Sequence, residues 1–385
     1  MSPARTDPSV FWRWPALVIT ALVVALIAIA CWINWTNPHP VDFVSFWAAG
    51  RMALGGHGAA IYDIVAHRAV EQSAAPVTGL MPFPYPPPFL LIVAPFGALP
   101  FGPAFTAWIV ITGAIFIAAA RTVMPTRFAL AHPAVLANGM IGQTGFLTAA
   151  LLLAGTRLLD ARPIVAGAML GLVAIKPQLA VLIPLAMIAG RYWRALAAAG
   201  WSALGMTALA SMMFGGSTYQ AFFGMAPTYG AFLADGRWPW NELASPYAFA
   251  RFAGVPMIAA AAVHAAIAIA AAAIVWRAWR LRWAHKAAIL AAATILVPPY
   301  VMSYDAIVLA LPLASLMLID RHCWLIPLLW GLCLLPVLNN FGAVQAPNGL
   351  PLAAAIMLFM LWRDAERSRS GANGQIEAPE TAHLL

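Results

Sequence analysis

Apolar segments of about membrane-spanning length recur through most of this chain. They leave little room for charge: 63% of the residues are hydrophobic and 9% are charged, whereas a soluble domain carries roughly 25% charged residues. We therefore expect an all-α integral membrane protein, because a helix satisfies its own backbone hydrogen bonds within lipid. A second, soluble domain does not fit between the segments.

The segments predict a polytopic transmembrane helical bundle of about 12 transmembrane helices with a long first external loop. They are residues 15–35, 87–100, 102–120, 128–141, 145–159, 163–190, 195–214, 255–276, 287–299, 303–320, 324–338 and 350–362. The domain map is a cytoplasmic N-terminal segment at 1–14, a transmembrane domain at 15–362 and a disordered cytoplasmic tail at 363–385.

On one side of this map, arginine and lysine gather near both termini and in two connections between segments. These ranges are residues 5–13, 191–194, 277–286 and 363–369. The positive-inside rule makes that side the cytoplasm, in the inner (plasma) membrane. Four further arginines fall on the opposite side and count against the map: Arg121, Arg127, Arg157 and Arg162. The net charge of +8 thus reflects membrane orientation, and no nucleic-acid partner is expected.

The sequence shows no ligand pattern for a metal or a cofactor, so neither is expected. Cys31, Cys323 and Cys333 lie in apolar stretches without metal-ligand spacing and are interpreted as small core residues. The spans contain no pair of histidines and no histidine–carboxylate spacing. A phosphate-binding glycine loop and a Gly-x-Ser-x-Gly turn are also missing, which disfavours an ATP-driven pump and a membrane serine hydrolase.

The first external loop, at about residues 36–86, is too long to be a simple connection and carries Asp42. An ionisable group at the membrane boundary is costly and therefore predicts function. A carboxylate there can deprotonate a hydroxyl while a nearby arginine neutralises a phosphate. Ser45, Arg51, Tyr62 and Asp63 share the loop. The alternatives are a helix N-cap or solvated acid for Asp42, and a plain Arg51–Asp63 salt bridge.

Two polar breaks follow in the chain. Tyr85 lies in the rigid run Pro84–Pro88, where it is either a site residue or an aromatic-belt residue. Residues 138–143, ending at Gln143, interrupt two apolar segments. Irregular polar backbone at membrane depth is tolerated inside protein or beside a cavity, so this break fits both a structural role and a ligand contact.

Lys176 is the strongest ionisable signal inside a predicted span, and it is followed by Pro177 and Gln178. A buried ammonium needs a partner, which could be Asp42, Asp305 or a substrate phosphate; the alternative is snorkelling to the interface.

Another break, at residues 298–305, carries Tyr300, Tyr304 and Asp305. There the alternative is a Ser303 N-cap with Asp305 in the first helical turn. A second external loop, 215–254, carries several aromatic residues and Glu242.

The ordered set of patches resembles glycosyltransferase family 87. The patches are Asp42 with Phe46–Arg51 and Ile61–Asp63, Tyr85–Pro87, Gly142–Gln143, Lys176–Gln178 and Tyr300–Asp305, and the resemblance covers roughly residues 15–362. It implies a GT-C fold and a polyprenyl-phosphate-sugar donor, typically with mannose. It also implies that a carboxylate of the first external loop is the base, and Asp42 is the matching residue. The family's late patch can carry a histidine, where this chain has Tyr304 and Asp305.

Together these features predict an inverting hexosyltransferase at the periplasmic face of the inner membrane. Asp42 would be the base, and the substrate-binding residues would be Ser45, Arg51, Tyr62, Tyr85, Gln143, Lys176, Gln178, Tyr300, Tyr304 and Asp305. The expected partners are the polyprenyl-phosphate-sugar donor, a lipid or glycan acceptor and membrane lipids. A polytopic secondary transporter or lipid flippase is the alternative, and a non-catalytic assembly partner is a third. The sequence does not indicate the oligomeric state or the glycosidic linkage that forms.

Overall fold

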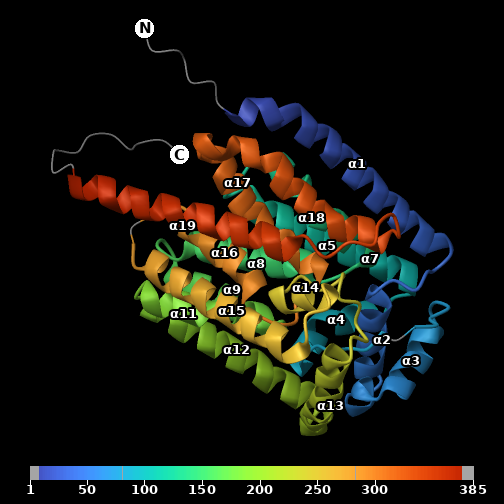
Figure 1. Ribbon diagram of the computed structural model, residues 1–385. Helices are drawn as coiled ribbons and strands as arrows, with labels where there is room; N and C mark the ends of the chain where they lie inside the picture. Colours follow the sequence, from blue (N-terminus) through green and yellow to red (C-terminus); the bar gives the residue numbers. More distant parts are fainter. Residues whose placement is uncertain (1–7, 80, 282, 375–385) are drawn as a thin grey trace.

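The computed structural model describes residues 8–374 except 80 and 282, and nearly all of its regular structure is helical (Figure 1). Within those residues no strand forms beyond an isolated bridge between Leu243 and Met302, which confirms the all-α class. Side chains are described except for 8–11, 320, 321, 323 and 370–374. The interpretation of Cys323 as a core residue therefore lies outside the described residues, as do predictions for 1–7 and 375–385.

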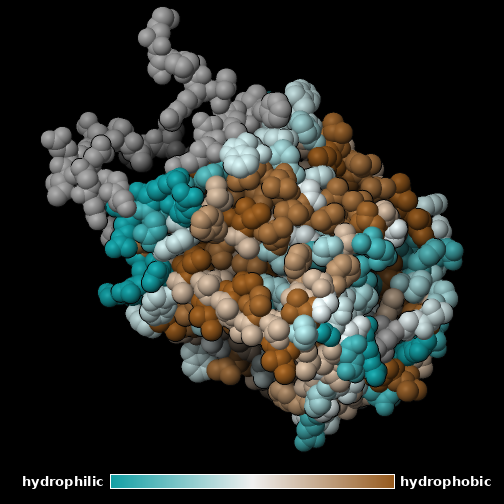
Figure 2. Space-filling model, in the orientation of Figure 1, coloured by the Kyte–Doolittle hydropathy of each residue, from teal (hydrophilic) through white to brown (hydrophobic). Residues whose placement is uncertain are grey.

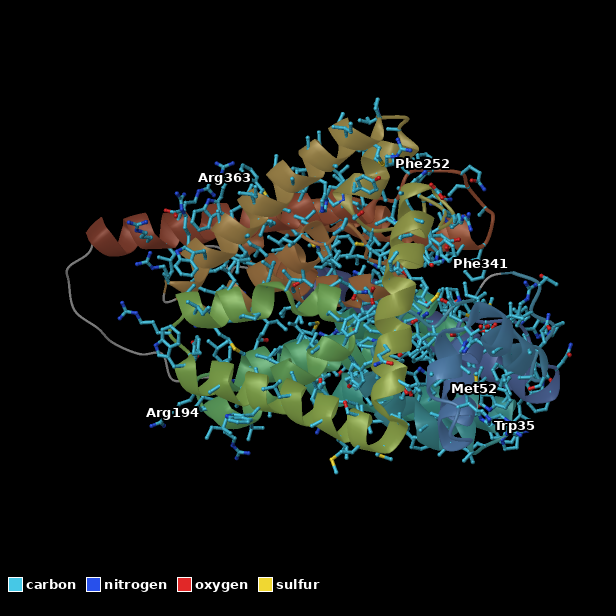
Figure 3. All side chains as sticks on the ribbon, turned by 90° about the horizontal axis from the view of Figure 1, so that it is seen from below. Trp35, Met52, Arg194, Phe252, Phe341 and Arg363 are labelled. Carbon is cyan, nitrogen blue, oxygen red and sulfur yellow. The ribbon has the colours of Figure 1, made fainter. Side chains whose placement is uncertain are left out.

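The molecule has two chemically different ends, joined by an apolar middle. Arg194 and Arg363 lie at one end, which we call the arginine end, whereas Trp35, Met52 and Phe341 lie at the other, the loop end (Figure 3). Hydrophobic side chains cover much of the surface between them (Figure 2). Four of the described helices are long and apolar enough to cross a membrane: α1 (Pro8–Thr36), α5 (Phe101–Ala120), α12 (Trp193–Phe214) and α15 (Met257–Trp279).

The first loop and the apolar segment after it fold into short helices at the loop end. They are α2 (Phe43–Leu54), η1 (Ala59–Tyr62), α3 (Ile64–Gln72), η2 (Pro87–Phe89) and α4 (Leu90–Gly97). α4 packs along α2, and the Trp47 indole donates to the Leu99 carbonyl at 2.9 Å. The next helix, α5, begins beside Trp35, because Gly102 lies against the Trp35 backbone. Residues 87–100, predicted as a crossing, therefore stay at the loop end.

This arrangement moves Arg121 and Arg127 to the arginine end. α5 starts at the loop end, and its 20 residues extend roughly 30 Å away from it. Arg127 follows in α6 (Thr126–Leu130), and its carbonyl accepts a hydrogen bond from Thr20 of α1 at 3.0 Å. Thr20 lies roughly 22 Å before Trp35 along that helix. The prediction that these two arginines oppose the others is therefore wrong.

Residues 163–190, predicted as one crossing, instead form a hairpin that enters and leaves at the arginine end. Its elements are α9 (Pro163–Leu172), η3 (Val173–Ile175), α10 (Pro177–Ala180) and α11 (Leu182–Ala189). The two ends of this segment are adjacent, because the Tyr192 hydroxyl donates to the Asp160 carboxylate at 2.5 Å. Arg157 and Arg162, which flank Asp160, therefore join the arginine end too, and the apex of the hairpin carries Lys176.

A second hairpin has the same direction. It consists of α16 (Lys286–Leu296), η4 (Ser303–Leu309) and α17 (Ala310–Leu318). Lys286 at its start donates to the Tyr192 hydroxyl at 2.6 Å, and His322 just beyond its end lies 2.6 Å from Asp364, next to Arg363. Its apex, at residues 297–302, therefore points away from the arginine end, as the apex of the first hairpin does.

The remaining helices complete the bundle. They are α7 (Pro133–Ile141), α8 (Gly145–Leu158), α13 (Gly216–Ala234), α14 (Pro246–Phe252), η5 (Asp320–Leu325), α18 (Ile326–Asn340) and α19 (Leu350–Gly374). α19 is helical through residues 363–374, which were predicted to begin a disordered tail. The count of about 12 crossings remains a prediction, because several apolar segments are shorter than a full span.

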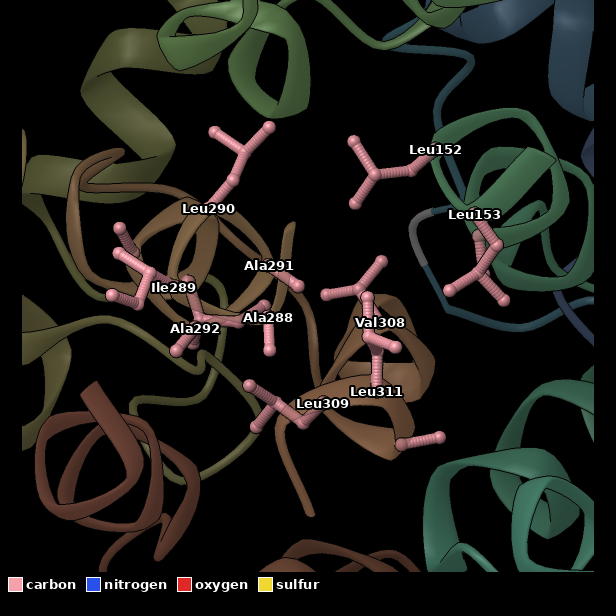
Figure 4. Packing of buried hydrophobic residues seen from close by; sticks show 14 of the residues in the cluster. Leu152, Leu153, Ala288, Ile289, Leu290, Ala291, Ala292, Val308, Leu309 and Leu311 are labelled. Carbon is pink, nitrogen blue, oxygen red and sulfur yellow. The ribbon is translucent and has the colours of Figure 1, made fainter. Parts of the chain in front are cut away.

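Small residues let the hairpins pack closely. Gly167 and Gly171 of α9 lie against the backbone of α12, where an added Cβ would collide with the Ala195 and Ala199 carbonyls. This small-xxx-small spacing is typical of close helix pairs in membranes. Figure 4 shows the shared aliphatic core, into which α8, α16 and η4 contribute side chains such as Leu152 and Ala291. Close packing around the hairpins holds their two apices in place.

Candidate active site

Asp42 lies in the connection between α1 and α2, and its carboxylate faces the turn between α7 and α8. It occupies the N-cap position of α2, but its side chain makes no capping hydrogen bond. Instead Oδ2 accepts from Nε2 of Gln143 at 2.9 Å. Burial raises the pKa of the Asp42 carboxyl, while the hydrogen bond from Gln143 and the charge of Lys176 lower it. Asp42 as a residue is partly exposed, and its carboxylate can serve as a base for a substrate hydroxyl that approaches it.

Gly142 is the reason that Gln143 meets Asp42. It ends α7 in the left-handed region, with φ of 74°, and a Cβ there would collide with Phe43 and Phe105. A glycine is therefore required for the turn and for the close approach of α2. The amide oxygen of Gln143 accepts from the Tyr85 hydroxyl at 2.8 Å, so both ends of the amide are engaged. The break at 138–143 thus serves as structure and as part of the site.

The ring, the hydroxyl and the carbonyl of Tyr85 all contact other residues. Its ring packs against Phe46 and Phe89, with centroid distances of 5.1 and 4.5 Å, and its carbonyl accepts from the Tyr62 hydroxyl at 2.8 Å. Its own hydroxyl also lies 3.4 Å from Thr144 Oγ1. Tyr62 is buried, and it positions the Tyr85 backbone instead of facing Asp42. The aromatic-belt alternative for Tyr85 does not fit this enclosure.

Lys176 and Asp305, at the apices of the two hairpins, form a buried ion pair. Nζ of Lys176 lies 2.6 Å from Oδ1 of Asp305, and the two side chains are 3% and 0% exposed. Lys176 also donates to Thr144 Oγ1 at 3.3 Å and lies 4.5 Å above the Tyr304 ring. Asp305 additionally accepts from the Met302 amide at 3.3 Å, which caps η4. Of the three partners considered for Lys176, the structure pairs it with Asp305, and the snorkelling alternative is wrong.

A narrow cleft opens beside this pair. Lys176, Gln178, Tyr300 and Tyr304 line it, and its volume is about 10 Å³. Within the described part of the chain, no hydrogen-bond partner is present for the Tyr300 hydroxyl, the Tyr304 hydroxyl or the Gln178 amide. Lys176 uses two of its three N–H donors. These groups are therefore free to bind an anionic or hydroxylated ligand.

An apolar groove continues from the cleft toward the membrane-facing side of α12. It has a volume of about 280 Å³ and shares Ile175 and Pro177 with the cleft. Its other walls come from η2, α9, α12 and α13, with Ala203, Met206 and Phe222 among the lining residues. An elongated apolar chain can lie in such a groove with its polar end at Lys176.

Two predicted site residues lie apart from this cluster. Ser45 is buried and contacts His67, with Oγ 3.1 Å from Nε2. Arg51 is exposed and lies over the Trp47 ring at 5.4 Å; nine residues of α2 place it roughly 13 Å from Asp42. The Arg51–Asp63 salt bridge does not form either, since Asp63 caps α3 by accepting from Val65 and Ala66 at 2.9 Å.

Two residues in or beside the cluster were not among the predicted site residues. Thr144 bridges Tyr85 and Lys176, and a threonine next to a break gives no signal of its own. Glu242 lies near Asp42: burial and the charge of Asp42 raise the pKa of its carboxyl. Its carbonyl accepts from the Ser303 hydroxyl at 2.6 Å, which ties the second loop to η4. The rarity of acids in this chain was the signal that could have identified Glu242.

Among the described residues, no group of three or more His, Cys, Asp or Glu side chains is placed to hold a metal ion. The polar groups of the site come mostly from the turns and connections between helices, with two from η4, and they converge at the loop-side apices. They are Asp42, Tyr85, Gln143, Thr144, Lys176, Tyr300, Tyr304 and Asp305.

Comparison with known proteins agrees with the resemblance. The model of Glycosyltransferase family 87 matches residues 83–303, which is more than half of the chain. The matched region contains Tyr85, Gln143, Lys176, Gln178 and Tyr300, and it leaves Asp42 and Asp305 outside. No curated protein and no solved structure matched. With its apolar helices and this family match, the chain is a membrane glycosyltransferase, and it belongs to glycosyltransferase family 87.

Proposed function

We propose that this protein transfers a hexose, with mannose the first candidate, from a polyprenyl-phosphate donor to a lipid or glycan acceptor. Asp42 is the general base in this proposal. The observation that carries it is the placement of a partly covered carboxylate, oriented by Gln143, beside a cluster of polar groups that includes an ammonium. A glycosyl transfer of this kind needs a base for the acceptor hydroxyl on one side of the anomeric carbon and a cation for the leaving phosphate on the other.

In the proposed reaction, Asp42 takes the proton of an acceptor hydroxyl while the acceptor oxygen attacks the anomeric carbon. The bond between that carbon and the phosphate oxygen breaks, and its electron pair leaves with the polyprenyl phosphate. Attack from the side opposite the leaving group inverts the configuration. The raised pKa of Asp42 favours this role, because a more basic carboxylate takes a proton more readily.

The leaving phosphate gains a negative charge, and Lys176 is placed to balance it. Its third N–H is free, and the unpartnered Tyr300 and Tyr304 hydroxyls are available as further donors. Asp305 keeps the ammonium at the apex but also neutralises part of its charge. The cleft is narrow, so we expect Tyr300 and Trp238, whose rings are 4.7 Å apart, to separate when the donor enters.

The apolar groove supports a donor with a long hydrocarbon chain. It begins at the walls of the Lys176 cleft and runs along α12, which faces outward for most of its length. Apolar carbons placed there leave water, which stabilises binding by about 0.8 kcal/mol for each methylene group. The position of the site at the loop end, opposite the arginine end, supports a periplasmic active face by the positive-inside rule.

The test is the transfer of label from radiolabelled polyprenyl-phosphate-mannose in membranes that contain the native protein or Asp42→Asn. We expect a new labelled product with the native protein and a loss of about 10²–10⁴-fold in rate with the variant, the usual contribution of a general base. Asp63→Asn is the matched control, because Asp63 is another acid of the same loop that only caps α3. Equal transfer by Asp42→Asn and the native protein would refute the role of Asp42.

A further inference from the structure

An open polar cleft lies at the arginine end, far from the Asp42 site. It has a volume of about 820 Å³ and lies between the α11–α12 turn and the α15–α16 connection. The side chains that give it its chemistry are Asp160, Arg191, Tyr192, Trp279, Arg280 and Lys286. Three cations therefore face one carboxylate, and the cleft carries an excess of positive charge.

The carboxylate does not neutralise the two arginines. Asp160 accepts from the Tyr192 hydroxyl at 2.5 Å, and that hydroxyl accepts in turn from Lys286 at 2.6 Å. No ion pair joins Arg191 or Arg280 to a carboxylate anywhere in the described chain. Both guanidinium groups thus remain available to an anion, for which they offer several N–H donors each.

Two aromatic rings in the wall of the cleft, those of Trp279 and Tyr192, contact Lys286. Trp279 is 3% exposed, and its indole N–H is buried without a hydrogen-bond partner among the described residues. Lys286 lies 5.5 Å from the ring of this tryptophan and 4.9 Å from that of Tyr192. These two rings therefore hold the Lys286 ammonium at the wall of the cleft.

Arg191 is held in a conformation that arginine avoids. It is the only non-glycine residue with a positive φ in the described chain, at 60°. A glycine would adopt this φ without strain. The arginine at this position therefore costs stability, which is consistent with a functional use of its guanidinium.

The surroundings of the cleft identify a membrane lipid as the source of the anion. α12 begins at the cleft, and most of its surface faces outward. Trp193 in its first turn is 58% exposed. Trp276 on the last turns of α15 is also exposed. Tryptophans at this level mark the boundary between head groups and hydrocarbon, so a lipid can place its phosphate in the cleft and its acyl chains along α12.

We propose that this cleft binds the phosphate of an anionic phospholipid. Arg191 and Arg280 contact the phosphate, and Lys286 completes the donor set. Basic pockets between transmembrane helices on the cytoplasmic side bind lipid head groups in this way. The proposal does not depend on the sugar-transfer reaction, since it concerns the other end of the bundle.

The test uses the full-length purified protein in detergent and radiolabelled phosphatidylglycerol, with phosphatidylcholine as the neutral lipid. Retained lipid is counted for the native protein, for Arg191→Gly with Arg280→Gln, and for Arg194→Gln. Arg194 is the matched control, because it is an exposed arginine at the same end that does not line the cleft. We expect each lining arginine to contribute roughly fivefold, so the double variant binds about 30-fold more weakly, and the control is unchanged.

Arg191→Gly alone keeps the test interpretable if the double variant fails to fold, because glycine relieves the strained φ. Equal retention of phosphatidylcholine, or undiminished retention by Arg191→Gly, would overturn the proposal. Excess inorganic phosphate provides the last arm. Failure to displace the phosphatidylglycerol supports a lipid ligand, whereas full displacement would mean that a free anion is the ligand and would overturn the lipid assignment.

Discussion

Two buried ion pairs of equal length lie in different parts of the bundle. Lys176 and Asp305 are 2.6 Å apart at the apices of two hairpins, and His322 and Asp364 are 2.6 Å apart near the arginine end. The side chains of both pairs are at most 5% exposed. By burial and distance alone, the two pairs are equivalent.

Their surroundings separate them. The Lys176–Asp305 pair borders a cleft whose hydroxyl and amide groups have no hydrogen-bond partner among the described residues, and it connects through Thr144 and Gln143 to Asp42. The His322–Asp364 pair joins η5 to α19, and Arg367 adds a third charge 3.7 Å from Asp364. A short buried ion pair is therefore weak evidence for a site by itself. Access and free polar groups around it distinguish a candidate site from a structural tie.

Among the changes that test the comparison of the two pairs, the largest effect is expected from breaking the pair beside the cleft. Lys176→Gln keeps a polar side chain, shorter by one atom, and removes the charge that balances the leaving phosphate. We expect the rate of sugar transfer to fall by about 10²–10³-fold, which is typical for the loss of one preorganised electrostatic group. Rates measured at saturating donor in membranes with matched protein levels check this. A rate equal to that of the native protein would leave the Lys176–Asp305 pair with the same structural role as His322–Asp364.

Blocking the groove tests whether the cleft belongs to a lipid donor. Ala203→Phe fills part of the groove, and we expect the KM for a long-chain polyprenyl donor to rise about tenfold, the equivalent of roughly two displaced methylene groups. A donor with a short prenyl chain should show no change. Ala197→Phe, at an exposed position of the same helix outside the groove, is the matched control. Equal KM changes in both variants would argue against the groove.

The locations of several site residues could be predicted from the sequence, because chain breaks are local features. The glycine at 142, the proline after Lys176 and the prolines before Tyr300 all mark turns that the structure contains. The sequence offered Asp305 as one of three possible partners of Lys176 but could not choose among them, since the residues are far apart in sequence and the hairpin at 163–190 has the length of one tilted crossing. The mistaken crossing at 87–100 had the same cause: apolar length alone does not reveal whether a helix crosses or returns.

Arg51 shows where helix geometry could have improved the prediction. The stretch from Phe43 to Leu54 reads as a helix, and a helix of nine further residues separates Arg51 from Asp42 by roughly 13 Å. Proximity in sequence was therefore a poor guide to proximity in the site. Residue Thr144, in contrast, was beyond prediction, because its role depends on which two apices meet.

A smaller effect is expected from Gln143→Ala, and it appears in the pH dependence. Asp42 must be ionised to act as a base, so activity falls as the pH drops through its pKa. The Gln143 amide lowers this pKa by donating to the carboxylate, and removing it leaves burial as the dominant influence. The acid limb of kcat against pH should therefore shift to higher pH. Gln178→Ala is the control, because Gln178 lines the cleft without contacting Asp42. An unshifted limb in Gln143→Ala would mean that another group sets the acid limb.

The smallest effect on activity is expected from His322→Ala, which breaks the other pair. The free energy of unfolding should fall by about 1–3 kcal/mol, because the variant removes a buried hydrogen-bond partner of Asp364. Arg367 remains near Asp364 and limits the loss. The specific activity of the folded protein should match that of the native protein, since this pair lies near the arginine end and does not border the cleft. Activity per folded molecule, with the folded fraction taken from a denaturant titration, measures both. A loss of specific activity as large as that of Lys176→Gln would show that the two pairs are coupled through the α16–α17 hairpin, and that access alone does not separate site from structure.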